Sequence, residues 1–136
     1  MPIISFSTRD ILRGKVVTPA WYRVHIESVG EAPSSTGTST NYPVEGTILF
    51  NGDNGNPEFA GVPIDWNFNS KAIGFAVGFL ASLGQEVTPG TRFELNHAAG
   101  KDIDVFVEND TYQNRLVNRV NHKYREPRTD VNAVTV

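Results

Sequence analysis

The sequence predicts a mainly β domain of five strands, with one short helix between the third and fourth strands. Three observations support this class. Segments with alternating apolar and polar residues recur along the chain, clusters of Gly, Asn, Pro and Ser separate them, and only one stretch has helical spacing. The 136 residues fit one domain, and a hydrophobic content of 39% is enough for one core.

The first two predicted strands follow a loosely held N-terminal arm of mixed composition, residues 1–18. The segment 21–29 is predicted to be a strand with one buried face, because its apolar side chains occupy every second position. Its inward set is Tyr22, Val24 and Ile26. A second alternating segment, 42–50, follows a loop rich in Ser, Thr and Gly, and its inward set is Tyr42, Val44, Ile48 and Phe50.

The third strand and the helix follow the turn cluster 51–56, whose Asn and Gly residues tolerate positive φ. The segment 59–68 has the inward set Val62, Ile64, Trp66 and Phe68. Asn69 or Ser70 can cap a helix over 72–83, where apolar residues recur at helical spacing. We expect this helix to be largely buried, with Gly74 and Gly78 allowing another backbone to approach closely.

The last two strands are predicted at 102–108 and 115–124, separated by a turn at 110–114. The element order β-β-β-α-β-β predicts a five-stranded OB-type β-barrel, with the helix at one open end. In such a barrel the first strand neighbours the fourth, and the third neighbours the fifth. We expect the barrel to span residues 19–125, and residues 126–136 to form a mobile polar tail.

Composition and motifs narrow the function classes. Without cysteine, the chain has no disulfide framework, thiolate metal site or cysteine nucleophile. The three histidines are scattered, and motifs for a hydrolase nucleophile, a phosphate-binding loop or a dinucleotide site are missing. We therefore expect a binding protein that is not an enzyme and uses no metal or cofactor. Because we see no signal peptide and no apolar run long enough for a bilayer, we expect a cytoplasmic protein without a membrane partner.

Charge is segregated along the chain, although its net value is only −3. Residues 1–29 hold four basic and two acidic residues, a net charge of +2. Residues 30–111 hold three basic and eleven acidic residues, a net charge of −8, and residues 112–136 hold five basic and two acidic residues, a net charge of +3. Such segregation can place a basic face on an acidic protein. Chance clustering of ordinary surface charge is the alternative.

The outward faces of the strands combine aromatic and basic residues. This combination is typical of single-stranded nucleic-acid binding, in which bases stack on rings and positive charges follow the phosphates. The candidate residues are Trp21, Arg23, His25, Phe106, Arg115, Arg119 and Lys123. Two structural alternatives stay open. Trp21 could cover a barrel end, and the basic residues of the last strand could pair with Asp102, Asp104 or Glu108 across the sheet.

Four stretches, 18–26, 68–75, 100–107 and 112–120, together resemble small phage-encoded proteins linked to single-stranded DNA binding in replication and recombination gene clusters. The most specific part is Gly100-Lys101, an alternating strand, a turn, and then Tyr112-x-x-Arg115-x-x-Asn118. The resemblance implies an OB-type fold, coating of single-stranded DNA without catalysis, and a homo-oligomer. By position it adds Lys101, Tyr112 and Asn118 to the candidate nucleic-acid-binding residues.

We therefore expect a phage single-stranded DNA-binding protein in the host cell cytoplasm, with replication or recombination proteins as further partners. Two other classes fit a barrel without catalytic motifs. One is a phage protein–protein interaction or structural module, which would suit the acidic middle and the Ser/Thr loop 34–40. The other is a protein that sequesters a nucleotide. Residues 130–136 contain one acid, Asp130, so recruitment of partners through an acidic tail is not expected.

Overall fold

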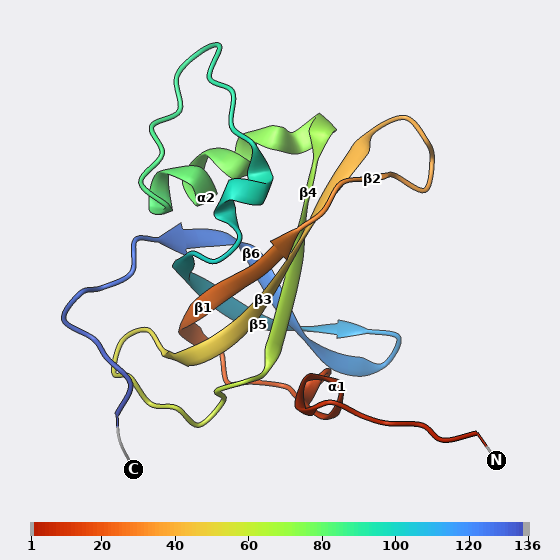
Figure 1. The fold of residues 1–136 in the computed structure, drawn as a ribbon, viewed down its shortest axis with the longest axis vertical. Coiled ribbons are helices and arrows are strands. Elements are labelled where there is room, and N and C mark those ends of the chain that lie inside the picture. The colour runs from red at the N-terminus through yellow and green to blue at the C-terminus, as the bar shows by residue number, and fades with distance from the viewer. Residues whose placement is uncertain (1, 135–136) are drawn as a thin grey trace.

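The computed structural model describes residues 2–134 (Figure 1). Met1 of the predicted arm and residues 135–136 of the predicted tail lie outside the described residues. The strands are β1 (Ala20–Val29), β2 (Ala32–Pro33), β3 (Thr40–Asn51), β4 (Pro63–Asn69), β5 (Asp102–Tyr112) and β6 (Arg115–Arg125). The helical elements are α1 (Thr8–Leu12), the 3-10 helix η1 (Ser70–Phe75), α2 (Ala76–Ser82) and the 3-10 helix η2 (Leu95–Ala98).

The six strands form one antiparallel sheet, so the mainly β class is confirmed. The strand order is β2-β3-β1-β5-β6, and β4 pairs with β3. β1 lies between β3 and β5, which confirms that the first predicted strand neighbours the fourth. The short strand β2 was not predicted, because its two residues, Ala32 and Pro33, extend the β1–β3 hairpin within a loop-like sequence.

The predicted closed barrel is wrong, because the sheet does not close. Within residues 2–134 no ladder joins β4 to β6, the strands expected to be neighbours across the closure. Aromatic rings fill the space between them: the Tyr124 ring centroid lies 6.1 Å from those of Trp66 and Phe68, and the Phe68 and His122 centroids are 5.3 Å apart. Rings packed there keep the two backbones beyond the roughly 4.8 Å spacing of paired strands.

The inward sides of the strands meet in one core. The fully buried apolar side chains from β1, β3 and β5 are Val24, Ile26, Val44, Ile48, Ile103, Val105 and Val107. The inward sets predicted for the first and third strands are confirmed, with Trp66 only 7% exposed. In the set predicted for the second strand, Val44 and Ile48 are buried, whereas Tyr42 and Phe50 are only half-buried. A bulge between Arg23 and Val24 pairs Phe50 with Arg23, whose guanidinium lies over the Phe50 ring at 5.1 Å.

The predicted helix over 72–83 is α-helical only in its second half. Asn69 caps η1 as expected, its side chain accepting a hydrogen bond from the Lys71 N–H at 2.9 Å. Ala72 then leaves the helical region, with φ −130° and ψ 38°. The 3.6-residue period therefore does not apply across η1, which changes the face that its side chains present.

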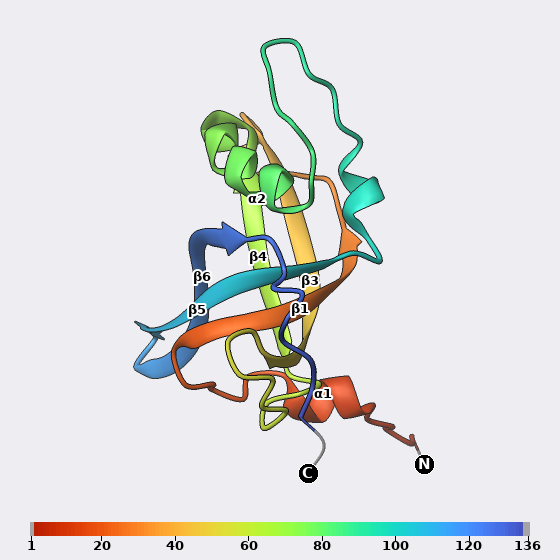
Figure 2. The ribbon, with the colours of Figure 1, turned by 90° about the vertical axis from the view of Figure 1, so that its left-hand side faces the viewer.

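The expectation of a largely buried helix is consequently wrong. Phe79 and Leu80 of α2 are buried, but Ile73, Phe75 and Val77 are 47%, 57% and 47% exposed. The close backbone approach expected at the glycines is also wrong, since a Cβ at Gly74 would meet nothing within 4 Å and one at Gly78 would meet only the Tyr124 side chain, at 4.0 Å. The helix packs on β6 at one end of the sheet, with the Phe79 and Tyr124 ring centroids 5.4 Å apart (Figures 1 and 2).

The first and last described segments of the chain lie at the end of the sheet opposite α2 (Figures 1 and 2). In the arm, Ser7 and Asp10 form a capping box for α1, and Val17 is buried. In the tail, Val131 is buried, and the Val134 N–H donates to the Gly55 carbonyl at 2.8 Å. Both flanking segments thus contact the sheet.

Candidate nucleic-acid interface

Outward residues of β1 lie directly opposite outward residues of β5. Trp21 pairs in register with Phe106, Arg23 with Asp104, and His25 with Asp102. Their inward neighbours on both strands are buried. Side chains on these rows therefore share the outer face of the sheet, where directly opposed residues lie about 5 Å apart.

Two aromatic rings and two cations meet on this outer face. The Trp21 and Phe106 rings are edge to face, with centroids 5.5 Å apart and planes at 78°. The Arg125 guanidinium lies over the Trp21 ring at 4.4 Å, and the Lys123 Nζ lies 5.3 Å from the centre of the Phe106 ring. We call these four residues the aromatic cluster. Its cation–π contacts hold positive charge beside the rings.

Next to the aromatic cluster, a buried carboxylate joins three strands. Asp104 is fully buried although it points outward. It accepts hydrogen bonds from Arg23 Nε at 2.6 Å and from Arg125 Nε at 3.0 Å. We call Arg23, Asp104 and Arg125 the Asp104 clasp. Because Arg23 is itself only 8% exposed, the clasp assigns it a structural role rather than contact with a polyanion.

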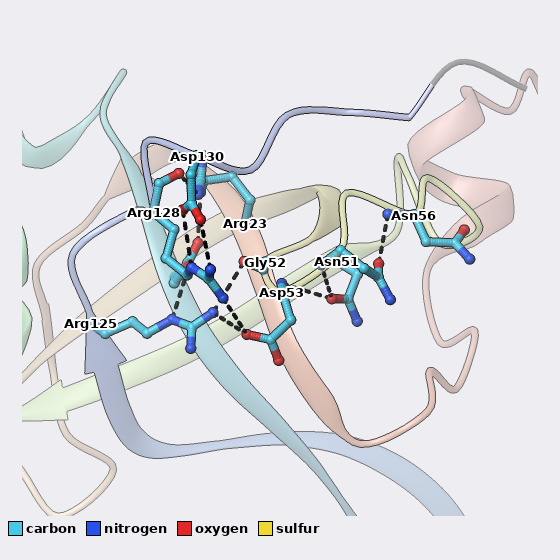
Figure 3. A network of polar contacts seen from close by, with 10 residues as sticks. Arg23, Asn51, Gly52, Asp53, Asn56, Arg125, Arg128 and Asp130 are labelled. Atoms are coloured by element: carbon cyan, nitrogen blue, oxygen red, sulfur yellow. Dashed lines mark hydrogen bonds and ion pairs between the residues drawn. The ribbon is translucent and has the colours of Figure 1, made fainter.

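The loop after β3 and the C-terminal tail cover the clasp (Figure 3). Arg125 also donates to Asp53 at 2.7 Å and to the Gly52 carbonyl at 3.1 Å, while Arg23 donates to the Arg128 carbonyl at 2.9 Å. Burial lowers the pKa of Arg125, but hydrogen bonds to Asp53 and Asp104, together with their charges, raise it above its ordinary value overall. Arg125 therefore stays charged where it overlies Trp21.

The β5–β6 hairpin extends the same face away from the aromatic cluster. Lys123 pairs with Glu108 at 3.1 Å, Arg119 pairs with Asp110, and Tyr112 lies opposite Arg115 at the tip. Tyr112 is 63% exposed, and no ion pair to Arg115 is found among residues 2–134. We call the outward residues Tyr112, Arg115, Arg119 and Lys123 the hairpin row.

The ion pairs of the hairpin row agree in part with the cross-strand alternative weighed from the sequence. Glu108 was an expected partner, whereas Asp110 was not. Asp102 pairs with His25 of β1, and Asp104 pairs with Arg23 of β1 and with Arg125 of β6 rather than with Arg115, Arg119 or Lys123. The Thr111 N–H and the Arg119 side chain both donate to Asp110, and they lower the pKa of its carboxyl. Both pairs are solvent-exposed, with side-chain exposures between 34% and 60%.

The remaining predicted residues lie outside the row. His25 hydrogen-bonds Asp102 at 2.7 Å on the outer face. Lys101 is exposed just before β5, at the far end from the hairpin tip. Asn118 lies on the opposite face, where its Oδ1 accepts from the Val17 N–H at 2.9 Å and its Nδ2 donates to the Lys15 carbonyl at 2.7 Å. Its side chain fixes the arm to β6.

Sequence reasoning missed Arg125, which belongs to both the aromatic cluster and the clasp. The predicted last strand ended at Tyr124, one residue short of β6. A signal for Arg125 is present in the sequence. Like Arg115, Arg119 and Lys123, it has an odd residue number, which puts all four on one strand face. Contributions from Asp53 and Arg128 had no sequence signal, since they lie in a loop and in the tail.

Two cavities open elsewhere on the surface. The larger, of about 670 Å³, lies between η1–α2, the loop 84–96 and the ends of β1 and β3; the smaller, of about 200 Å³, lies between Tyr22 and the turn after β3. None of the side chains lining the larger cavity, all within residues 2–134, is basic. Over the same residues, no cluster of three or more His, Asp or Glu side chains could hold a metal ion.

Comparison with known proteins adds no assignment: no protein-family model matches the chain, and no curated protein sequence is significantly similar to it. Within residues 2–134, none of the helices has the length and apolar character needed to cross a membrane.

Proposed function

We propose that this chain binds single-stranded DNA without catalysis, through the aromatic cluster and the hairpin row. The observation that carries the proposal is the Trp21–Phe106 pair, flanked by Arg125 and Lys123 on an outer sheet face. Aromatic rings beside cations are the components of a sequence-tolerant single-strand site, in which each stacked base contributes about 1–3 kcal/mol.

The acidic partners of the hairpin row do not prevent phosphate binding. Lys123–Glu108 and Arg119–Asp110 are exposed ion pairs, and such pairs contribute only about 0–1 kcal/mol. A phosphate can therefore replace a carboxylate at little cost. Because Arg115 and Tyr112 continue the row to the hairpin tip, one strand of DNA could follow β5–β6 from the tip to Trp21.

The sequence resemblance supports a more specific role, namely coating of single-stranded DNA during phage replication or recombination. That role includes self-association and contacts with other replication or recombination proteins. It depends on the resemblance of the stretches around Gly100-Lys101 and Tyr112-x-x-Arg115-x-x-Asn118.

A salt titration of binding to a 30-nucleotide oligonucleotide tests the proposal. Fluorescence anisotropy should show single-stranded DNA bound at low salt and released as salt increases, because binding releases counterions from the phosphates. The Arg115→Glu/Arg119→Glu variant should bind at least about tenfold more weakly, with a shallower salt slope. Failure of the unaltered chain to bind at low salt would refute the proposal.

The matched control is Lys71→Glu/Arg92→Glu, which changes net charge equally at two exposed residues outside the row. It should keep most of the binding, whereas an equal loss would indicate a general charge effect.

Trp21→Phe should remove most of the tryptophan quenching on DNA addition, because the other tryptophan, Trp66, is buried.

A second candidate function, protein–protein interaction, is favoured by the larger cavity, whose lining is mostly apolar. Nucleotide sequestration has less support, because the lining includes Glu31 and Glu94 and no basic side chain that would bind phosphate. Thermal stabilisation by mononucleotides in the absence of DNA would favour sequestration.

A further inference from the structure

Two exposed apolar clusters lie at opposite ends of the fold (Figures 1 and 2). One is the segment 2–6 before α1, where Ile3, Ile4 and Phe6 are 89%, 76% and 69% exposed. The other is the rim of the larger cavity, where Ile73 and Val77 are each 47% exposed. Exposed apolar patches on a soluble domain commonly mark contact surfaces.

The larger cavity, which we call the apical groove, has the size and lining to accept apolar side chains. Its volume is about 670 Å³, and Ile73, Val77 and Leu80 form its helical wall. Tyr42 and Phe93 line the groove from β3 and from the loop before η2. Gly74 adds no side chain, and a Cβ there would meet nothing within 4 Å, so the wall stays open.

The arm is fixed at its base and points away from its own apical groove. Arg9 and Arg13 of the α1 region both pair with Asp65, at 3.5 and 3.0 Å, and the Ser7–Asp10 capping box begins the helix. In both views the segment before α1 leaves the molecule at the end opposite α2 (Figures 1 and 2). An occupant of the groove with these side chains must therefore come from another copy.

Charge also favours contact between an arm and a groove over contact between two like ends. The lining of the apical groove includes the acidic residues Glu31 and Glu94. The base of the arm carries three basic residues, Arg9, Arg13 and Lys15, against the two acidic residues Asp10 and Asp65, a net charge of +1, and Arg13 is 51% exposed. Opposite charges would steer the two ends together, whereas two grooves would repel each other.

We infer that the Ile3–Phe6 segment of one copy docks in the apical groove of a second copy. Because the arm and the groove are different surfaces, the contact is head to tail and does not close on a pair of molecules. It leaves one free arm and one free groove, so further copies add at either end. This self-association uses neither the aromatic cluster nor the hairpin row, and it does not depend on DNA binding.

Sedimentation velocity of the full chain over about 1 μM to 1 mM tests the inference, because a short apolar segment makes a small, transient interface. The unaltered chain should form species that grow beyond dimers as concentration rises. Ile4→Asp/Phe6→Asp replaces apolar side chains of the arm by carboxylates, and Val77→Asp places a carboxylate in the wall of the groove. Each variant should associate at least about tenfold more weakly than the unaltered chain. The control Leu116→Asp, at a 53% exposed apolar residue of the hairpin, should associate like the unaltered chain.

Mixing the two variants gives the decisive measurement. The arm variant keeps its groove and the groove variant keeps its arm, so an equimolar mixture should form one-to-one dimers and nothing larger. Ile73→Asp replaces Val77→Asp if the latter loses its β-sheet circular dichroism. The inference is overturned by a monomeric unaltered chain at all concentrations, by growth that stops at dimers, or by a mixture that stays monomeric.

Discussion

The Asp104 clasp and the ion pairs of the hairpin row lie on the same face of β5 and use the same residue types, yet their surroundings differ. Asp104 is fully buried between two arginines, whereas the Asp110 side chain is 47% exposed beside Arg119. In a buried pair each charge is needed for stability, because the partner cannot be solvated by water when the pair is broken. Exposure leaves the pair exchangeable, which is what a phosphate-binding surface requires.

Breaking the clasp should have the largest effect. Asp104→Ala leaves the buried Arg23 guanidinium without its carboxylate and should lower the free energy of unfolding by about 3–5 kcal/mol. Urea denaturation followed by circular dichroism measures this loss. The matched control is Asp110→Ala on the same strand face, which should cost clearly less. Similar losses for the two variants would contradict the proposed difference.

Arg125→Lys should have the next largest effect. The guanidinium donates to Asp104, Asp53 and the Gly52 carbonyl while lying over Trp21, and one ammonium group cannot make all these contacts. We expect a loss of about 1–3 kcal/mol in the free energy of unfolding, corresponding to one or two charge-assisted hydrogen bonds. In the same denaturation assay Arg119→Lys should be nearly neutral, since Arg119 contacts one exposed carboxylate. If Arg125→Lys left the free energy of unfolding unchanged, the clasp would need only a positive charge at this position.

The sequence predicted the strands better than their closure. Alternation identified the inward residues of β1 and β4, because each of these strands has one apolar face in the core. It could not show that Trp66, Phe68 and Tyr124 would pack between β4 and β6 and keep the sheet open. Helical periodicity likewise failed across η1, where a 3-10 turn changes which side chains are exposed.

The candidate interface was predictable where it depends on strand parity. Trp21, Phe106, Arg119 and Lys123 share the outer face as expected. Strand parity could not distinguish Arg23 from the exposed basic residues, because its burial depends on its contacts with Asp104 and with the Arg128 carbonyl of the tail, which lie far away in the sequence. Nor could it show that Asn118 is engaged by the arm, a contact between residues far apart in the chain.

A double-mutant cycle on Lys123 and Glu108 should give a small effect in the hairpin row. Replacing each by Ala, singly and together, should yield a coupling free energy of about 0.2–1 kcal/mol, as for other exposed pairs. The coupling should fall when salt is raised to about 1 M, where the screening length is near 3 Å. A coupling free energy that does not change with salt would mean that this pair is shielded from solvent, as the ion pairs of the clasp are.

The smallest expected effect is the pH dependence contributed by Asp110. Hydrogen bonds from the Thr111 N–H and from Arg119 lower its pKa below the ordinary value of 3.8, so folding favours the charged carboxylate. Its contribution to stability is therefore complete above pH 3.8 and is lost as pH falls through the lower folded pKa. Asp110→Asn lacks this contribution, and the difference in unfolding free energy between the two proteins should narrow as pH falls below 3.8.

Denaturation of both proteins at pH 7 and at successive steps below pH 4 measures this narrowing. Asp10 and Asp130, whose pKa values are also lowered, titrate alike in the two proteins and cancel in the difference. A difference that stays constant with pH would mean that neither the Thr111 N–H nor Arg119 favours the charged carboxylate. Arg119 would then be free to meet a phosphate without first leaving Asp110, and the hairpin row would differ from the clasp more sharply than the structure indicates.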